Sequence, residues 1–277
     1  MNLSFVKMNG LGNSFILMTD MDDEVSGKLD IHRLAKAVCD VNFGIGADGL
    51  ILVKASANQD FRMVIINEDG SEAEMCGNGM RCFVKYLVER GISTASSFSV
   101  ETLAGTISAT VKEGDLVEVN MGVPIFENGD VVGEKQGDTV GVRVDDRAYT
   151  YISMGNPHAI TFVDDFNFDW RAVGRQVEKE TSVFPNHTNV EFVKVESSSE
   201  MTMKVWERGC GETQACGTGT CALVVAGVHE QKVSPGEVLV HLPGGDLTIH
   251  YKKGGPVLMT GPAVTVCSGT YSYDESK

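Results

Sequence analysis

The sequence predicts an α+β fold of two pseudo-symmetric lobes, each an antiparallel-rich sheet wrapped around a central helix. The first observation is a repeat, because Cys76-Gly77-Asn78-Gly79 recurs as Cys216-Gly217-Thr218-Gly219, 140 residues later. A helical pattern follows each copy, amphipathic after the first and apolar on every face after the second. Short alternating segments, typical of antiparallel strands, surround both copies. Repeated supersecondary units of this kind predict two similar lobes.

Length and spacing divide the chain into two domains. At 277 residues the chain exceeds the roughly 100–200 residues of an ordinary domain. We expect an N-terminal lobe over 1–122 and a C-terminal lobe over 123–262, with residues 263–277 returning to the first lobe as a last strand, near 263–273. Glycine and charged residues between Pro124 and about Asp138 predict a linker between the lobes.

Composition excludes several classes of partner. Hydrophobic residues form 42% of the chain, enough for a large core, and the net charge is −15. Nucleic acids and anionic membranes require clustered Lys and Arg, which an acidic chain does not offer. No apolar run approaches the roughly 18 residues of a spanning helix, and no signal-peptide pattern is visible. We therefore expect a cytoplasmic protein that acts on a small molecule.

The first lobe is expected to begin with two strands, Leu3–Met8 and Ser14–Met18, joined by a tight turn. Asp30 can cap a helix that runs to about Val38. The glycine-rich stretch 42–49 is interpreted as a bend, because Gly-x-Gly without a phosphate-binding lysine motif or a full dinucleotide pattern is weak evidence for a nucleotide site. Further strands are predicted at 50–54, 61–67, 98–103, 105–111 and 116–121.

The second half repeats the order of the first. Asn13 lies 63 residues before Cys76, and Asn156 lies 60 residues before Cys216. Polar residues also recur nine positions before each cysteine, and later strand positions recur at the offset of 140. These matched pairs are Asn67 with Glu207, Val100 with Val240 and Gly105 with Gly245.

Two cysteines at helix N-termini suggest acid–base chemistry. The unpaired N–H groups and the dipole at such a terminus favour an anion, either a thiolate or a bound carboxylate. Because this position can lower a thiol pKa from about 8.5, we expect one of Cys76 and Cys216 to be a thiolate and the other a thiol. Together they can remove a proton from one face of a carbon acid and return one to the other, without a cofactor. The N–H groups expected to hold its carboxylate belong to Gly77, Asn78, Gly217 and Thr218.

Other interpretations of the cysteines stay open at this point. An odd total of seven without a Cys-x-x-Cys motif favours reduced thiols over a disulfide framework. A redox couple between Cys76 and Cys216 is the second hypothesis. A metal site built from Cys76, Cys82, Cys210, Cys216 and His158 is disfavoured, because no pair has zinc-knuckle spacing. The remaining assignments are Cys39 and Cys267 as buried small hydrophobes, Cys82 and Cys221 as core-facing, and Cys210 as a loop residue without a role.

These motifs resemble those of the diaminopimelate epimerases, cofactor-independent enzymes of lysine and peptidoglycan-precursor biosynthesis. The resemblance runs from Lys7 to about Pro262. It implies the fold of that family, with substrate clamped between the lobes, interconversion of LL- and meso-diaminopimelate, no cofactor or metal, and a homodimer. Its most specific segments are 67–71 with 76–81, then 155–158, 189–190, 206–209 and 215–219.

The resemblance also implies a role for each matching residue. Cys76 and Cys216 are the expected catalytic thiols, and His158 and Glu207 are the groups that tune them. At the far end of the substrate, Arg208 and nearby asparagine amides are expected to bind the carboxylate, while Glu207 pairs with the ammonium. The full expected substrate-binding set is Asn13, Asn67, Gly77, Asn78, Asn156, Asn189, Glu207, Arg208, Gly217 and Thr218.

Several of these polar residues also have purely structural interpretations. Asn13 and Asn156 lie in glycine-rich turns, whose left-handed backbone Asn tolerates. The pair Glu207-Arg208 is compatible with a surface ion pair of small energetic value. Asn67 and Asn189 lie at predicted strand ends, where capping a turn is equally ordinary.

Two comparisons within this fold refine the resemblance. Related racemases, including those for proline, also use two thiols but commonly carry His where Asn78 stands, so Asn78 favours the epimerases. Val41-Asn42 occupies a place where the family usually has a basic residue. That departure leaves the packing of the loop open.

Overall fold

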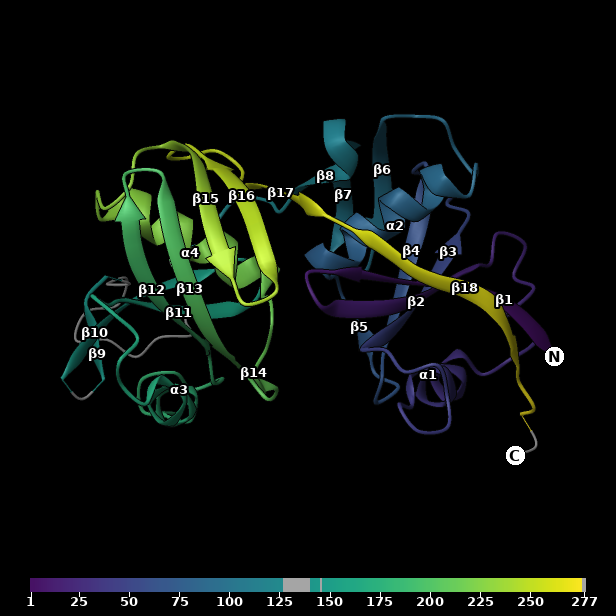
Figure 1. Ribbon diagram of the computed structural model, residues 1–277, viewed down its shortest axis with the longest axis horizontal. Coiled ribbons are helices and arrows are strands. Elements are labelled where there is room, and N and C mark those ends of the chain that lie inside the picture. The colour runs from purple at the N-terminus through teal and green to yellow at the C-terminus, as the bar shows by residue number, and fades with distance from the viewer. Residues whose placement is uncertain (127–139, 145, 276–277) are drawn as a thin grey trace. The chain divides into compact units, whose positions relative to one another are not determined.

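The computed structural model describes residues 1–126, 140–144 and 146–275 and contains two compact units. Unit 1 comprises Met1–Val119 with Gly261–Lys277, and unit 2 comprises Asn120–Thr260. The same order of strands and helices occurs in each unit, so the predicted α+β fold with a repeated lobe is confirmed (Figure 1). Most of the predicted linker between Pro124 and Asp138 lies outside the described residues. Among the described residues, no helix is long and apolar enough to cross a membrane.

Unit 1 folds a mostly antiparallel sheet around one central helix. Its elements are β1 (Asn2–Gly10), β2 (Asn13–Thr19), α1 (Ile31–Cys39), β3 (Gly49–Lys54), β4 (Phe61–Asn67), β5 (Glu72–Ala73), α2 (Gly77–Glu89), β6 (Ser97–Thr102), β7 (Gly105–Val111), η1 (Glu113–Asp115), β8 (Leu116–Asn120) and β18 (Val264–Ser272). Among the strands that the structure describes in this unit, β2 with β3 and β4 with β6 pair in parallel. Helix α2 packs against β1, β2, β3 and β7, while α1 packs on β3 and β4.

Local sequence signals explain the helices of unit 1. The Asp30 side chain caps α1 by accepting from the N–H groups of His32 and Arg33, as predicted. One face of α1 carries Leu34 and Val38, which are buried with strand residues in a hydrophobic cluster. Apolar residues at helical spacing therefore fix the orientation of the helix.

Strand β18 pairs antiparallel with β1, in a register that runs from Asn2 with Ser272 to Asn9 with Val264. Most of its side chains are exposed. The prediction that Cys267 is a buried hydrophobe is therefore wrong, because it lies on this exposed strand. Cys39 and Cys82 are buried as expected, and burial raises the pKa of each thiol to about 12.

Unit 2 repeats the arrangement of unit 1. Its elements are β9 (Val142–Val144), β10 (Arg147–Ser153), β11 (Pro157–Phe162), α3 (Trp170–Glu178), β12 (Asn189–Ser197), β13 (Glu200–Glu207), β14 (Gly211–Glu212), α4 (Gly217–His229), β15 (Gly236–Leu242), β16 (Gly245–Tyr251) and β17 (Leu258–Pro262). Helix α4 packs against β10, β11, β12 and β16 and is buried along nearly its whole length, as its apolar sequence predicts. Cys221 is part of this buried helix, so its predicted core-facing position is confirmed.

The loop after α1 holds its shape without a basic residue. Asp40 accepts hydrogen bonds from the N–H groups of Asn42 and Phe43, at 2.7 and 2.8 Å. Val41 and Phe43 are exposed by 78% and 89%, so neither side chain contributes to the core. The departure at Val41-Asn42 therefore leaves the loop anchored by Asp40 instead.

Gly174 in α3 allows the helix to approach the sheet closely. A Cβ at this position would lie 2.6 Å from Trp206 Cβ. Gly-to-Ala changes inside helices usually stabilise by about 0.5–1 kcal/mol, but overpacking against backbone-proximal atoms costs about 1–3 kcal/mol. We expect Gly174→Ala to lower the free energy of unfolding, measured by urea denaturation.

Gly227→Ala in α4 is the matched control for this prediction. The nearest atom there is Met201 Cε, the end of a flexible side chain that can move aside. We expect a smaller loss than for Gly174→Ala. Equal losses for the two variants would contradict the assignment of Gly174 to a close helix–sheet contact.

Candidate functional site

Each of the two repeated cysteines caps the N-terminus of its central helix, as predicted. The Cys76 sulfur accepts from Gly79 N–H at 3.4 Å, and the Cys216 sulfur accepts from Gly219 N–H at 3.4 Å. The first N–H groups of an α-helix have no carbonyl acceptor within the helix. The residues that supply them here are Gly77 and Asn78 in α2, and Gly217 and Thr218 in α4.

In unit 1, amide side chains surround Cys76. The thiol donates to Asn13 Oδ1 at 3.6 Å, and Asn78 Nδ2 donates to the same oxygen at 3.4 Å. Asn13 in turn donates from Nδ2 to Asp48 at 3.0 Å. Arg81, which is fully buried, donates to Asn78 Oδ1 at 2.9 Å. Asn13, Cys76 and Asn78, predicted from distant parts of the chain, are therefore brought together.

Asn67 lies at the end of β4, where the sequence places it. Its side chain donates to Ser71 Oγ at 2.9 Å, and its backbone N–H donates to Ser71 O at 2.8 Å. Asp69 accepts from both the N–H and the hydroxyl of Ser71. The polar motif 67–71 thus forms a hydrogen-bonded turn immediately before β5, and this turn also contacts Asp48 and His32.

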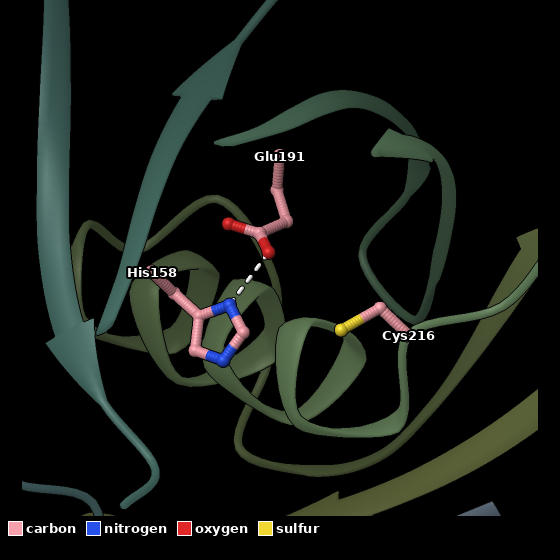
Figure 2. A group of neighbouring side chains, drawn as sticks. All are labelled: His158, Glu191 and Cys216. Carbon is pink, nitrogen blue, oxygen red and sulfur yellow. Dashed lines mark hydrogen bonds and ion pairs between the residues drawn. The ribbon is translucent and has the colours of Figure 1, made fainter. Parts of the chain in front are cut away.

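In unit 2, His158 lies at the centre of a buried polar network (Figure 2). Its Nδ1 is 2.6 Å from Glu191 Oε1, and its Nε2 is 3.0 Å from Asn156 Oδ1. The Asn156 amide nitrogen donates to Thr218 Oγ1 at 3.2 Å, and that hydroxyl is 3.6 Å from the Cys216 sulfur. Predicted residues on β11 and α4, together with the preceding turn, therefore form one connected group.

Cys216 is 5% exposed, and its environment disfavours the thiolate. Burial raises its pKa well above the ordinary value, and the negative charges of Glu207 and Glu191 raise it further. This direction agrees with the expectation that one of the two cysteines is a thiol, because desolvation and two carboxylates outweigh the hydrogen bonds with Thr218 and Gly219 at the helix N-terminus. Burial also raises the pKa of Glu207, partly offset by hydrogen bonds from Thr213 and Cys216.

Glu207 and Arg208 form side-chain hydrogen bonds with different partners. Glu207 accepts a hydrogen bond from the Thr213 hydroxyl, while Arg208 donates from Nη1 to Asn186 O at 3.1 Å. Asn189, at the start of β12, accepts from Arg208 N–H at 2.9 Å and donates to Pro157 O at 2.7 Å. Asn189 therefore fixes the turn that carries Arg208, in addition to any contact with a ligand.

Two acidic residues of these networks were not predicted from the sequence. Glu191 is fully buried in β12, and Asp48 accepts from Asn13 and Ser14 just before β3. The signal for Glu191 was a charged residue between the apolar residues Val190 and Phe192. Asp48 lies within the glycine-rich bend, which we interpreted as a turn only, and no sequence feature linked it to Asn13.

One trio could hold a metal ion, among the residues that the structure describes. The candidate ligand atoms of His158, Glu191 and Cys216 lie within 4.8 Å of one another. Imidazole, carboxylate and thiolate are ligands that zinc accepts. Cys82 and Cys210, which the metal hypothesis also recruited, are respectively in the core and in an exposed loop, so that larger set does not converge.

Comparison with known proteins identifies relatives over nearly the whole chain. The family model described as diaminopimelate epimerase matches residues 5–127 and 150–266. A diaminopimelate epimerase from Desulfitobacterium hafniense is 45% identical over 282 residues, covering 98% of this chain and 99% of the relative. One from Geobacillus thermodenitrificans is 47% identical over 281 residues, covering 97% and 96%.

Solved structures share the fold at low sequence identity. A phenazine biosynthesis protein of the PhzF family from Bacillus anthracis aligns with a TM-score of 0.73 at 19% identity, covering 99% of this chain and all of that one. A hydroxyproline epimerase from Agrobacterium vitis aligns with a TM-score of 0.66 at 15% identity, covering 97% and 92%. These similarities establish the fold alone.

Gly219 is the point where the helix backbone approaches Glu191. A Cβ there would lie 2.5 Å from Glu191 Oε1 and 3.2 Å from the Cys216 sulfur. Because the carboxylate is buried and bonded to His158, we expect Gly219→Ala to reduce the free energy of unfolding by about 1–3 kcal/mol. Urea denaturation measures the loss.

Gly79→Ala is the control at the equivalent position of unit 1. Its Cβ would meet Ile51 Cδ1 at 3.2 Å, a methyl group that can shift slightly. We expect a clearly smaller loss. If Gly79→Ala were as destabilising as Gly219→Ala, the clash with the buried carboxylate would not be the cause.

Proposed function

Because this chain belongs to the diaminopimelate epimerase family, we propose that it interconverts LL- and meso-diaminopimelate by proton transfer between Cys76 and Cys216. One observation carries the mechanism: equivalent helix N-termini in two copies of one repeat each present a thiol beside the N–H groups of the first helical turn. A thiol supplies the proton transfer, and helix N-terminal N–H groups bind carboxylates.

The reaction begins with Cys76 as the base and Cys216 as the acid. The Cys76 thiolate takes the α-proton, and the electron pair left on Cα delocalises into the substrate carboxylate. The N–H groups at the two helix N-termini stabilise this charge. Cys216, whose raised pKa favours the thiol, then donates its proton to the opposite face. The pair ends as a Cys76 thiol and a Cys216 thiolate, which is the starting state for the reverse reaction.

The polar residues around each thiol have supporting roles in this proposal. Asn13 and Asn78 orient Cys76, while His158 and Glu207 tune Cys216. Asn67, Asn156 and Asn189, with Arg208, bind the far end of diaminopimelate, and Glu207 pairs with its ammonium. Turn-forming and capping contacts of these asparagines are compatible with such roles, because an amide nitrogen has two hydrogens to donate.

The proposal places the enzyme in the cytoplasm, as a homodimer, in the biosynthesis of lysine and peptidoglycan precursors. No disulfide is recorded among the described residues, which suits a reducing compartment. The dimer rests on the resemblance to the family. No cofactor takes part in the proposed proton transfer.

Recognition of the distal carboxylate predicts strong discrimination against lysine, which lacks that group. A site built to hydrogen-bond a group rejects analogues without it by a factor on the order of 10⁴ in kcat/KM. Arg208→Lys should reduce the ratio of kcat/KM for diaminopimelate to kcat/KM for free lysine. The reason is that a Lys side chain at position 208 cannot form the bidentate contact with a carboxylate. Coupled assays of both substrates measure it. Equal turnover of lysine and diaminopimelate would show that Arg208 does not read the distal end.

The two-thiol mechanism predicts where solvent hydrogen enters. In heavy water, the acid delivers solvent deuterium to the product, while the base carries off the substrate's own proton. Early in the reaction, meso product should hold deuterium at the inverted carbon and unreacted LL substrate should stay almost unlabelled, as measured by mass spectrometry. Rapid labelling of the starting isomer would point to a single base.

Variants that each lack one of the two catalytic cysteines test the same mechanism by a separate route. Each thiol is required in both directions, so Cys76→Ala and Cys216→Ala should each reduce kcat by a factor on the order of 10³ or more. Cys210→Ala is the control, because this exposed thiol has no role in the proposal. A Cys216→Ala variant with near-native turnover would exclude the mechanism.

A further inference from the structure

The two units carry different types of side chain at equivalent positions near their cysteines. In unit 1, Phe15 pairs with Gly49 in neighbouring parallel strands, and in unit 2 His158 pairs with Asn189 in the same way. Two residues further along β3 and β12 stand Ile51 and Glu191. An apolar pair in one unit is thus replaced by an ionisable pair in the other.

Contacts with the helix N-termini support this equivalence. A Cβ on Gly79 would meet the Ile51 side chain, and a Cβ on Gly219 would meet the Glu191 carboxylate. Phe15 and Ile51 are buried, which shows that this fold fills the space with apolar side chains. Burying a carboxylate and an imidazole in the same place costs desolvation free energy. Packing alone therefore does not account for His158 and Glu191.

The hydrogen bonds fix how the His158 ring is held. Because the Asn156 amide nitrogen donates to Thr218, its Oδ1 faces His158 and must accept from Nε2. Glu191 Oε1 lies 2.6 Å from the other ring nitrogen, so a proton is shared between the carboxylate and Nδ1. Glu191 Oε2 has no hydrogen-bond partner among the described residues. The hydrogen bond of the Glu191 carboxylate is therefore made with the His158 ring.

We propose that Glu191 is a positioning residue of the epimerisation site: through its hydrogen bond with Nδ1 it holds the His158 ring in one orientation beside the Cys216 thiol. This inference rests on the proposed function of Cys216. Glu191 is fully buried and lies beside His158 and Cys216, so it acts through them (Figure 2). The ionisable groups that face it are His158 from β11, Cys216 at the start of α4 and Glu207 from β13.

The two thiols therefore have different neighbours. The Glu191 carboxylate and the His158 ring lie within 4.8 Å of the Cys216 sulfur. The residue of unit 1 that corresponds to Glu191 is Ile51, which carries no charge.

Glu191→Gln in the full-length enzyme tests the proposal, because it keeps the shape of the side chain and removes its charge. We expect kcat to fall roughly tenfold to a hundredfold with KM little changed, since Glu191 does not touch substrate. Glu230→Gln is the matched control, a carboxylate that accepts from Thr150 at the far end of α4.

Nitrogen-15 NMR of the His158 ring provides a readout that does not depend on substrate. The parent should show hydrogen on both ring nitrogens, and Glu191→Gln should show Nδ1 without hydrogen, with the signal assigned by its loss in His158→Phe. Unchanged ring signals, or parental kcat in Glu191→Gln, would overturn the proposal. If the parent did not epimerise diaminopimelate, the proposed function would fail, but the ring signals would still decide how Glu191 acts on His158.

The double variant His158→Phe with Glu191→Ile separates positioning from structure. It gives unit 2 the buried pair that unit 1 carries, so it should fold with the circular dichroism of the parent. Failure of this variant to fold would show that the core of unit 2 requires the ionisable pair, which would overturn the proposal.

Discussion

The need to satisfy the first N–H groups of two buried helices determines the rest of the site. A helix N-terminus without a capping acceptor exposes donors whose burial is costly. Here a sulfur atom fills that role in each unit, 3.4 Å from Gly79 N in one and from Gly219 N in the other. The cap fixes the position of each thiol beside the first N–H groups of its helix. In the proposed function, capping and substrate binding draw on the same set of donors.

The fold is repeated in the two units, but the polar and charged groups around the two cysteines are not. The strands and central helices of the two units correspond at an offset near 140, yet amides surround Cys76 and carboxylates lie beside Cys216. An inverting proton transfer requires one group to give a proton while the other takes one. The duplicated scaffold places one thiol at the equivalent helix N-terminus of each unit, and divergence at a few buried positions gives the two thiols different neighbours.

Local sequence signals predicted the elements, whereas long-range packing determined the features that were missed. The predicted strands 61–67 and 105–111 match β4 and β7, and Asp30 caps α1 as expected, because alternation and capping are read within a few residues. The caps at Cys76 and Cys216 followed from the repeat.

The features that were left open or missed depend on distant segments. The pKa of Cys216 depends on carboxylates from β12 and β13, and Cys267 is exposed because nothing in the described chain covers its strand. The burial of Glu191 depends on α4 lying over β12. Residue spacing and composition do not determine which segment of the chain packs over which other segment.

The pairing of β1 with β18 orders the events of folding during translation. Unit 2 is encoded between these two strands, so a ribosome completes all of unit 2 before it makes the partner of β1. Until then, one edge of β1 lacks its neighbour, and an unpaired strand edge is prone to associate with other chains. Closing a contact across such a sequence distance also slows folding. Unit 2 can therefore fold first on the ribosome, while unit 1 waits for its last strand.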